Sequence, residues 1–202
     1  MRRLSLTVGI TAMLSAVSAV AQDTVRTAPD SVPEPFRSGV YLTAADFTAR
    51  RLAHEIDCRV ATHMIDRHTF LNRPYVDVTH RDERMRHAKA EIFGYRGCDS
   101  TDVRFAEGRE YRVLATAPML LYERRWRRPG RTAIMFVERR FSTSADAPLR
   151  PLTRDEIKRA YPDNPMLHRL LDEEVRSDEE LMAFDAAHGT YRITQLLVRA
   201  TS

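Results

Sequence analysis

A cluster of arginines around the single tryptophan is the segment of this chain with the clearest potential for chemistry. The cluster consists of Arg124, Arg125, Trp126, Arg127, Arg128 and Arg131. A guanidinium group donates paired hydrogen bonds to phosphate or carboxylate, and a tryptophan ring suits an interface between water and an apolar phase. The cluster is therefore a candidate for binding an anion such as a lipid headgroup, a phosphorylated glycan or an acidic protein. The alternative is a solvated loop in an arginine-rich chain.

Three potential metal ligands, His63, Asp66 and His68, lie close together in the sequence. A helix would place only His63 and Asp66 on one face, and a strand would place only Asp66 and His68 there. Since no single element presents all three to one ion and no recognised zinc spacing is present, the sequence predicts neither a metal site nor a cofactor. His80 and His87 would join the group only through the fold.

Motifs of nucleophilic catalysis are absent from the sequence. It contains no Gly-x-Ser-x-Gly elbow, no Ser-x-x-Lys pair and no glycine-rich phosphate loop. The carboxylates at 172–174 and 178–180 fit solvated faces and helix starts, because negative charge is favourable near a helix N-terminus. No catalytic residue is assigned from the sequence.

The first 21 residues indicate where the protein acts. Arg2 and Arg3 give a positive start, residues 4–20 are apolar or small, and residues 19–21 read Ala-Val-Ala. This pattern is typical of a secretory signal peptide over residues 1–21, and the apolar run is short for a membrane span. We expect a bacterial protein that is exported to the periplasm or secreted, and that does not span a membrane after cleavage.

Export changes how the charge is interpreted. Cleavage removes two arginines and no acidic residue, so the formal net charge of +4 falls to +2. A nucleic-acid partner is not expected, because it would require basic residues concentrated on one face and because export separates the chain from nucleic acid.

Cys58 and Cys98 are the two cysteines of the chain. In an oxidising compartment, two cysteines are best interpreted as one disulfide bond. Closing a loop of about 40 residues would contribute roughly 4 kcal/mol in the loop-entropy account.

Composition also predicts the domain organisation. Residues 22–37 are polar and proline-rich and offer little to bury, which predicts a flexible linker. Residues 38–202 are long enough for a single domain with a substantial core. Strand patterns occupy residues 38–148 and helical patterns residues 152–200.

Strand patterns recur with turn signals at short intervals. Residues 75–80 alternate between apolar and polar, and Glu107-Gly108-Arg109 predicts a tight hairpin because glycine accepts a positive φ. A short helix should begin at Thr43 with Asp46 in the capping position. Other strands are predicted over 40–42, 91–95, 103–106, 110–114, 119–125 and 132–142, with a loop at 127–130 that would place the arginine cluster at a hairpin tip.

After Pro151 the apolar spacing becomes helical. One helix should run from Thr153 to Pro162, and a second, capped by Asp163 or Asn164, should bury an apolar stripe. The stripe comprises Met166, Leu167, Leu170, Leu171 and Val175. A third helix is predicted from Ser177 through Phe184 to Ala187, and the spacing over 193–200 favours a fourth.

Four segments resemble, in their order, parts of a family of exported bacterial proteins. They are Gly39-Val40-Tyr41-Leu42-Thr43 with Asp46-Phe47, Ile92-Phe93-Gly94-Tyr95, the strand pair within residues 103–114, and Leu152-Thr153 with Tyr161-Pro162-Asp163-Asn164. The resemblance implies an exported single domain. Because the family has no assigned activity, it implies no site residue.

Together these patterns predict an α+β protein: an antiparallel β-meander, as a curved sheet or small barrel, with a C-terminal helical segment. The function expected first is a non-catalytic binding or scaffolding module of the cell envelope, whose partner is an anionic envelope component or another envelope protein. The alternatives are an envelope hydrolase with a histidine–carboxylate site and a carrier with an apolar cavity for a small ligand.

Overall fold

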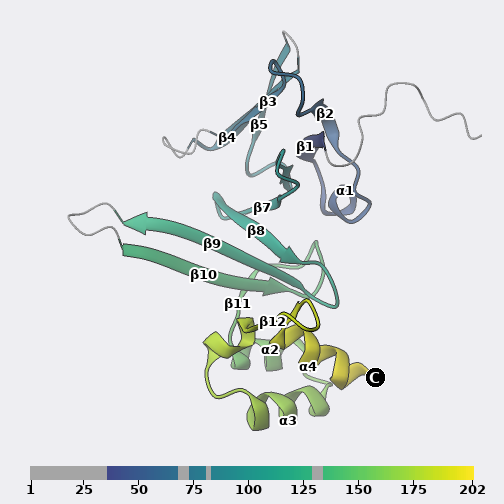
Figure 1. Ribbon diagram of the computed structural model, residues 1–202, viewed down its shortest axis with the longest axis vertical. Coiled ribbons are helices and arrows are strands. Elements are labelled where there is room, and N and C mark those ends of the chain that lie inside the picture. Colours follow the sequence, from purple (N-terminus) through teal and green to yellow (C-terminus); the bar gives the residue numbers. More distant parts are fainter. Residues whose placement is uncertain (1–35, 68–72, 81–82, 129–133) are drawn as a thin grey trace, which may run out of the picture. The chain divides into compact units, whose positions relative to one another are not determined.

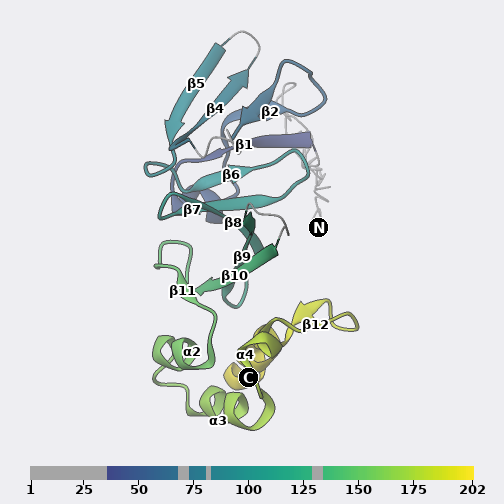
Figure 2. The same cartoon turned by 90° about the vertical axis from the view of Figure 1, so that its left-hand side faces the viewer.

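The computed structural model describes residues 36–67, 73–80, 83–128 and 134–202. It confirms the α+β fold with an antiparallel meander. The main sheet has the strand order β11-β10-β9-β8-β7-β6-β1-β2 and curls strongly (Figures 1 and 2). Its strands are β1 (Arg37–Tyr41), β2 (Ala53–Asp57), β6 (Gly94–Arg96), β7 (Asp102–Ala106), β8 (Arg109–Ala115), β9 (Leu120–Arg128), β10 (Ile134–Ser142) and β11 (Arg150–Pro151).

A second, three-stranded sheet covers one end of the main sheet. It consists of β3 (Met64–Asp66), β4 (Tyr75–His80) and β5 (Glu83–Ala88), in the order β3-β4-β5. The bounds of β4 confirm the strand predicted there, but its burial does not alternate, because Asp77 is buried like Val76 and Val78. Val76 and Val78 are fully buried and pack with Val103 and Phe105 of β7 and with Tyr95 of β6.

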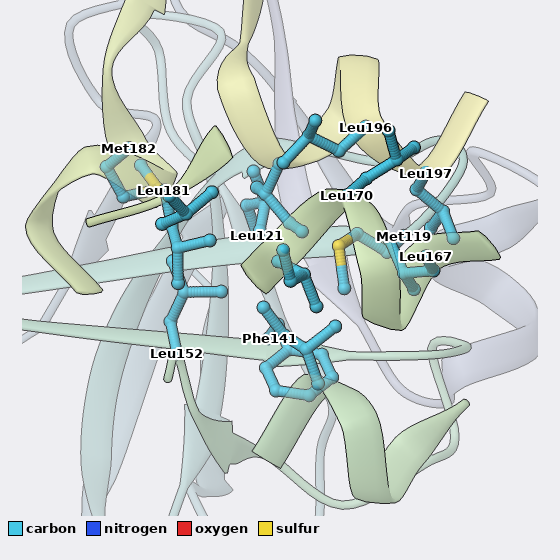
Figure 3. Packing of buried hydrophobic residues seen from close by; sticks show 14 residues of the cluster. Met119, Leu121, Phe141, Leu152, Leu167, Leu170, Leu181, Met182, Leu196 and Leu197 are labelled. Carbon is cyan, nitrogen blue, oxygen red and sulfur yellow. The ribbon is translucent and has the colours of Figure 1, made fainter. Parts of the chain in front are cut away.

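Helices cover the other end of the main sheet (Figure 3). Met119, Leu121 of β9 and Phe141 of β10 form the floor of this core. The helices are α2 (Arg154–Ala160), α3 (Pro165–Glu174), the 3₁₀ helix η2 (Asp178–Met182) and α4 (Arg192–Thr201). They contribute Leu167, Leu170, Leu181, Leu196 and Leu197, among others.

The strand register shows that both covers lie on the same face of the main sheet. Val103, Arg112 and Glu123 are opposite one another across β7, β8 and β9, and residues paired in this way share a face. Val103 is in the core beneath the small sheet, whereas Leu121, two residues from Glu123 on β9, is in the core beneath the helices. Arg112 and Glu123 therefore lie on a strip between the two covers.

The opposite face of the main sheet is covered by the short helix α1 (Ala44–Thr48) and the segment after β10. Its core includes Tyr41, Phe47, Phe93, Tyr111 and Tyr122. The predicted start of α1 is confirmed, because the Thr43 side chain accepts from the Asp46 backbone while Asp46 accepts from the Thr43 backbone.

Two predictions in the helical segment are wrong. Met166 was predicted to lie in the buried stripe of α3 but is exposed, and the stripe is formed by Leu167, Leu170, Leu171 and Val175. The third helix ends at Met182 and does not reach Ala187. The hairpin of β12 (Phe184–Asp185) and β13 (Thr190–Tyr191) occupies its place, with Phe184 exposed. Phe184 and Tyr191 contact each other across this hairpin, with ring centroids 5.3 Å apart.

The predicted Cys58–Cys98 disulfide is present, with the two Cα atoms 5.6 Å apart. Cys58 follows β2 and Cys98 follows β6, the two strands that flank β1 in the main sheet. The bond therefore links the neighbours of the first strand. β1 begins at Arg37, the last residue of the predicted linker; the rest of that linker before Phe36, and the predicted signal peptide, lie outside the described residues. No helix within the described part of the chain is long and apolar enough to cross a membrane.

Candidate functional site

The described part of the arginine cluster, residues 124–128, lies on a strand. β9 continues through Arg128, where a loop at 127–130 was predicted. Residues 124–128 pair with residues 134–138 of β10, and the pairing of β9 with β8 ends at Glu123. We call residues 124–128 and 134–138 the ribbon; it runs past the end of β8 (Figure 1). Arg131 and the side chain of Arg128 lie outside the described parts.

One face of the ribbon carries stacked rings. Trp126 is paired with Phe136, and their rings are stacked with centroids 5.4 Å apart. The Arg124 guanidinium lies 4.5 Å from the centre of the Trp126 ring, and one of its nitrogens is 3.5 Å from a carboxylate oxygen of Glu138. A cation over a tryptophan face is attracted by the ring quadrupole. This face is thus held in one arrangement by contacts within the ribbon.

Apolar side chains and a free guanidinium are exposed along the rest of the ribbon. Ile134, Met135 and Val137 are 55%, 47% and 44% exposed. Arg127 is exposed and makes no hydrogen bond or ion pair with another described residue. Arg125 donates to Glu123 at 2.5 Å, and this hydrogen bond raises the pKa of Arg125. The ribbon therefore combines fixed positive charge with apolar surface that the described fold leaves uncovered.

The histidines form two ring pairs. His63 contacts His80 edge-on, with centroids 4.4 Å apart, and His54 lies 4.9 Å from His87. Burial and the neighbouring His54 lower the pKa of His87. Within the described ranges no three histidine, cysteine, aspartate or glutamate side chains are grouped so that they could hold a metal ion. His68 lies outside those ranges, and the structure places His63 and Asp66 in or beside β3.

A histidine–carboxylate pair that was not predicted occurs in the β12–β13 hairpin. His188 Nδ1 is 2.7 Å from Asp185, beside a cavity of about 460 Å³ lined by Thr194, Gln195 and Val198. Asp185 also accepts from Gln195 and from the backbone N–H groups of Ala187 and His188, and these bonds lower its pKa. With this set of donors, Asp185 closes the hairpin turn.

A groove occupies the strip between the two covers of the main sheet. It consists of two cavities, of about 310 and 380 Å³, that share the lining residues Arg67, Tyr95, Asp99, Thr101 and Val103. One end adds His63, Met64 and Ile65. The other adds Glu110, Arg112, Glu123, Arg124 and Arg125. The groove therefore changes along its length from partly apolar to charged.

A hydrogen-bonded network forms one wall of the groove. The buried Lys89 amine donates to Glu110 at 2.9 Å and to the Arg67 carbonyl oxygen at 3.4 Å. The Tyr95 hydroxyl accepts from Arg67 at 2.9 Å and donates to Glu110 at 3.5 Å. Burial, together with the negative charge of Glu110, raises the pKa of Tyr95 to about 12. At neutral pH the phenol is therefore neutral and does not repel an anion in the groove.

Comparison with known proteins yields no match to a family model, to a curated protein or to a solved structure. The functional argument accordingly rests on the geometry of the ribbon and the groove.

The sequence indicated the arginine cluster, but neither the exposed apolar side chains of β10 in the ribbon nor the groove. The cluster residues are close together in the sequence, whereas Arg67, Lys89, Tyr95, Glu110 and Arg112 come from separate parts of the chain. One signal was available, because 30 of the 32 basic residues are arginine and Lys89 is one of two lysines. In such a chain a lysine stands out, because a compact ammonium and a guanidinium fork are not interchangeable.

Proposed function

We propose that this chain is an exported, non-catalytic binding module whose ribbon docks on a lipid bilayer that carries anionic headgroups. The observation that supports this most directly is the combination, on one two-stranded element, of Arg124, Trp126 and Arg127 with three exposed apolar side chains. The prediction of export from residues 1–21 and the family resemblance remain predictions, as do the hydrolase and carrier alternatives.

Charge favours an anionic surface as the partner. Arg127 has donors that no described residue uses, and guanidinium groups bind phosphate in a bidentate manner. Each basic residue near an anionic membrane contributes about 1 kcal/mol, which is about a fivefold change in the binding constant. A neutral bilayer would gain only the apolar part of the interaction.

The distribution of apolar residues favours lipid over an acidic protein. In a strand, successive side chains point to opposite faces, so Ile134 and Met135 lie on opposite faces of the ribbon. A protein partner would cover one face, whereas a bilayer interface surrounds an inserted hairpin on both faces. Tryptophan is enriched at this depth of a membrane because its ring is apolar and its N–H is polar.

Trp126 provides a direct test because it is the only tryptophan in the chain. We expect the purified exported protein to sediment with vesicles of phosphatidylcholine and phosphatidylglycerol, and its fluorescence to shift to shorter wavelength. Vesicles of phosphatidylcholine alone should bind much less. Lipids brominated in the acyl chain should quench the emission if the ribbon inserts.

Substitutions test whether vesicle binding depends on the ribbon or on the overall positive charge of the protein. Arg127→Ser should weaken binding about fivefold, and Met135→Ser with Val137→Ser should remove the fluorescence shift. Arg169→Ser on α3 and Val198→Ser on α4 are matched controls at other exposed positions. Failure of the wild-type protein to bind anionic vesicles, or equal binding by the ribbon variants, would contradict the proposal.

A further inference from the structure

The groove is a separate candidate site with the dimensions of a small-molecule pocket. Its two adjoining cavities of about 310 and 380 Å³ lie at the lower end of the range for ligand sites, about 300–1,000 Å³. It lies on the strip between the two covers, where Arg112 is exposed and Glu123 is buried. Arg124 and Arg125 of the ribbon also line the charged end of the groove, whereas Trp126, Arg127 and the exposed apolar side chains of the ribbon do not.

The carboxylates that line the groove already have donors within the protein. Glu110 accepts from Lys89, and Glu123 accepts from Arg125. Asp99 accepts from the backbone N–H of Thr101 at 3.0 Å. These acceptors are therefore poor sites for a cationic ligand, which would have to displace an existing partner.

Unused donors, by contrast, are available at the charged end. The Arg112 side chain is exposed, interacts electrostatically with the Asp99 carboxylate, and donates no hydrogen bond to a residue that the structure describes. Arg67 uses one terminal nitrogen to donate to Tyr95, and a guanidinium has five N–H groups in all. Both arginines line the same cavity. Their remaining donors match the oxygens of a carboxylate or a phosphate.

The other end of the groove offers an apolar surface. Met64, Ile65 and Val103 line it together with the ring of Tyr95. Tyr95 itself is fixed by hydrogen bonds to Arg67 and Glu110, and Glu110 is in turn held by Lys89. The rigid wall between the two ends therefore sets the distance between a charged group and an apolar one.

We propose that the groove binds a small organic oxyanion, with its carboxylate or phosphate on Arg112 and Arg67 and its apolar body over Ile65 and Val103. The charged group supplies orientation through bidentate hydrogen bonds, and the apolar body supplies affinity through burial. Inorganic phosphate has the charged group but no apolar body, and should bind more weakly than an oxyanion that carries an aromatic ring.

The test uses three probes on the full exported protein: phenyl phosphate, phenylacetate and inorganic phosphate. Binding is followed by titration calorimetry and by amide chemical shifts. We expect saturable binding of at least one aromatic probe at concentrations up to about 10 mM, and about tenfold weaker binding of inorganic phosphate. A preference between phenyl phosphate and phenylacetate identifies which oxyanion the arginines select. Amide shifts should concentrate at residues 95–112.

Variants connect the binding to the groove. Arg112→Gln should weaken binding of the aromatic probe about tenfold. Arg112→Lys should weaken it less, because lysine keeps the positive charge although it lacks the paired donors of the guanidinium. Arg169→Gln is the matched exposed control, and Arg127→Ser should bind anionic vesicles about fivefold more weakly but bind the aromatic probe as the wild type does. Equal affinity of Arg112→Gln and wild type, equal affinity for inorganic phosphate, or no saturable binding of either aromatic probe would overturn the proposal. If Arg127→Ser weakens vesicle binding while no probe binds to the groove, the groove proposal has failed and the ribbon proposal has not.

Discussion

Nζ of Lys89 lies 2.9 Å from Oε1 of Glu110, and the lysine side chain is 3% exposed while the glutamate side chain is 24% exposed. The two partners of this ion pair therefore differ in their access to water. The ammonium depends on Glu110 and on one carbonyl oxygen for the hydrogen bonds that water would otherwise provide, whereas the carboxylate is partly hydrated.

This difference predicts an asymmetry between two substitutions. Glu110→Gln leaves the buried ammonium without a counter-charge and should lower the free energy of unfolding by about 3 kcal/mol. Lys89→Met removes the buried charge, fills similar volume and leaves a carboxylate that water can reach, so it should cost only about 1 kcal/mol. Urea unfolding at neutral pH measures both. A larger loss of unfolding free energy for Lys89→Met than for Glu110→Gln would show that the buried ammonium does not depend on Glu110 in this way.

Tyr95 predicts a loss of stability in alkaline solution. Its pKa in the folded protein is about 12, whereas tyrosines in unfolded chains ionise near pH 10. The folded state holds this proton more tightly, so stability is complete below pH 10 and falls as the pH rises toward 12, by roughly 2 to 3 kcal/mol.

Tyr95→Phe has no proton to lose and should show a smaller fall over that interval. Tyr191→Phe is the control, since the Tyr191 hydroxyl makes no hydrogen bond within the described parts of the chain. The measurement is chemical unfolding of the three proteins between about pH 9 and pH 12. Parallel curves for wild type and Tyr95→Phe would contradict the cause given for the raised pKa.

Gly94 in β6 is predicted to be intolerant of a side chain. A Cβ atom at this position would overlap the carbonyl oxygen of Val103 on the paired strand β7. Since that oxygen belongs to the backbone, the sheet itself would have to shift, and Gly94→Ala should cost about 3 kcal/mol or prevent folding.

Gly108→Ala is the comparison, because Gly108 has a φ of +70° and open space around it. Only backbone strain opposes that alanine, at a cost of about 1 kcal/mol. Thermal unfolding and soluble yield should therefore rank the variants as wild type, Gly108→Ala and Gly94→Ala. The reverse order of the two variants would be inconsistent with the close approach of β6 and β7.

The disulfide is expected to contribute strongly to stability. It closes a loop with a sequence separation of 40 residues, and the loop-entropy account gives roughly 4 kcal/mol for its removal. Cys58→Ala with Cys98→Ala should unfold at correspondingly lower urea concentration. The oxidised wild type should take up no alkylating reagent until it is unfolded and reduced. A change of stability below about 1 kcal/mol on removal would show that the reduced chain is already constrained.

Local sequence signals predicted much of the fold. The strand over Tyr75–His80 and the capping of α1 depend on residues near one another, and both are confirmed. In the Glu107-Gly108 turn both residues have a positive φ, as a tight hairpin turn requires.

The helix predicted to Ala187 failed because contacts within the β12–β13 hairpin overrode the apolar spacing. Leu181 and Phe184 are three residues apart, as in a helix, but Ala183 is extended, with a ψ of 121°. Asp185 then closes a turn with His188, and Phe184 contacts Tyr191 across the hairpin. Neither contact is visible in a local pattern of hydrophobicity.

The two candidate sites differ in how far the sequence could predict them. The arginine cluster lies in one short stretch of sequence and was identified directly; Arg124 and Arg125 were predicted on a strand, whereas Arg127 and Arg128 were predicted in a loop. The groove requires the register that places Val103, Arg112 and Glu123 side by side and the separate covers that leave this strip open. Pairing between strands is determined by the whole fold, so residues as distant as Arg67 and Arg112 share no local signal.

The position of β1 between β2 and β6 has a consequence for the order in which the protein assembles. β2 follows β1 closely and can pair with it as soon as both have emerged from a ribosome or a translocation pore, whereas β6 begins only at Gly94. One edge of β1 must therefore remain open until the chain has been made as far as β6, and β7 to β10 can then add as successive hairpins. The Cys58–Cys98 bond can close as soon as β2 and β6 are both present, so it can fix β1 between its two neighbours before the later strands of the main sheet are made.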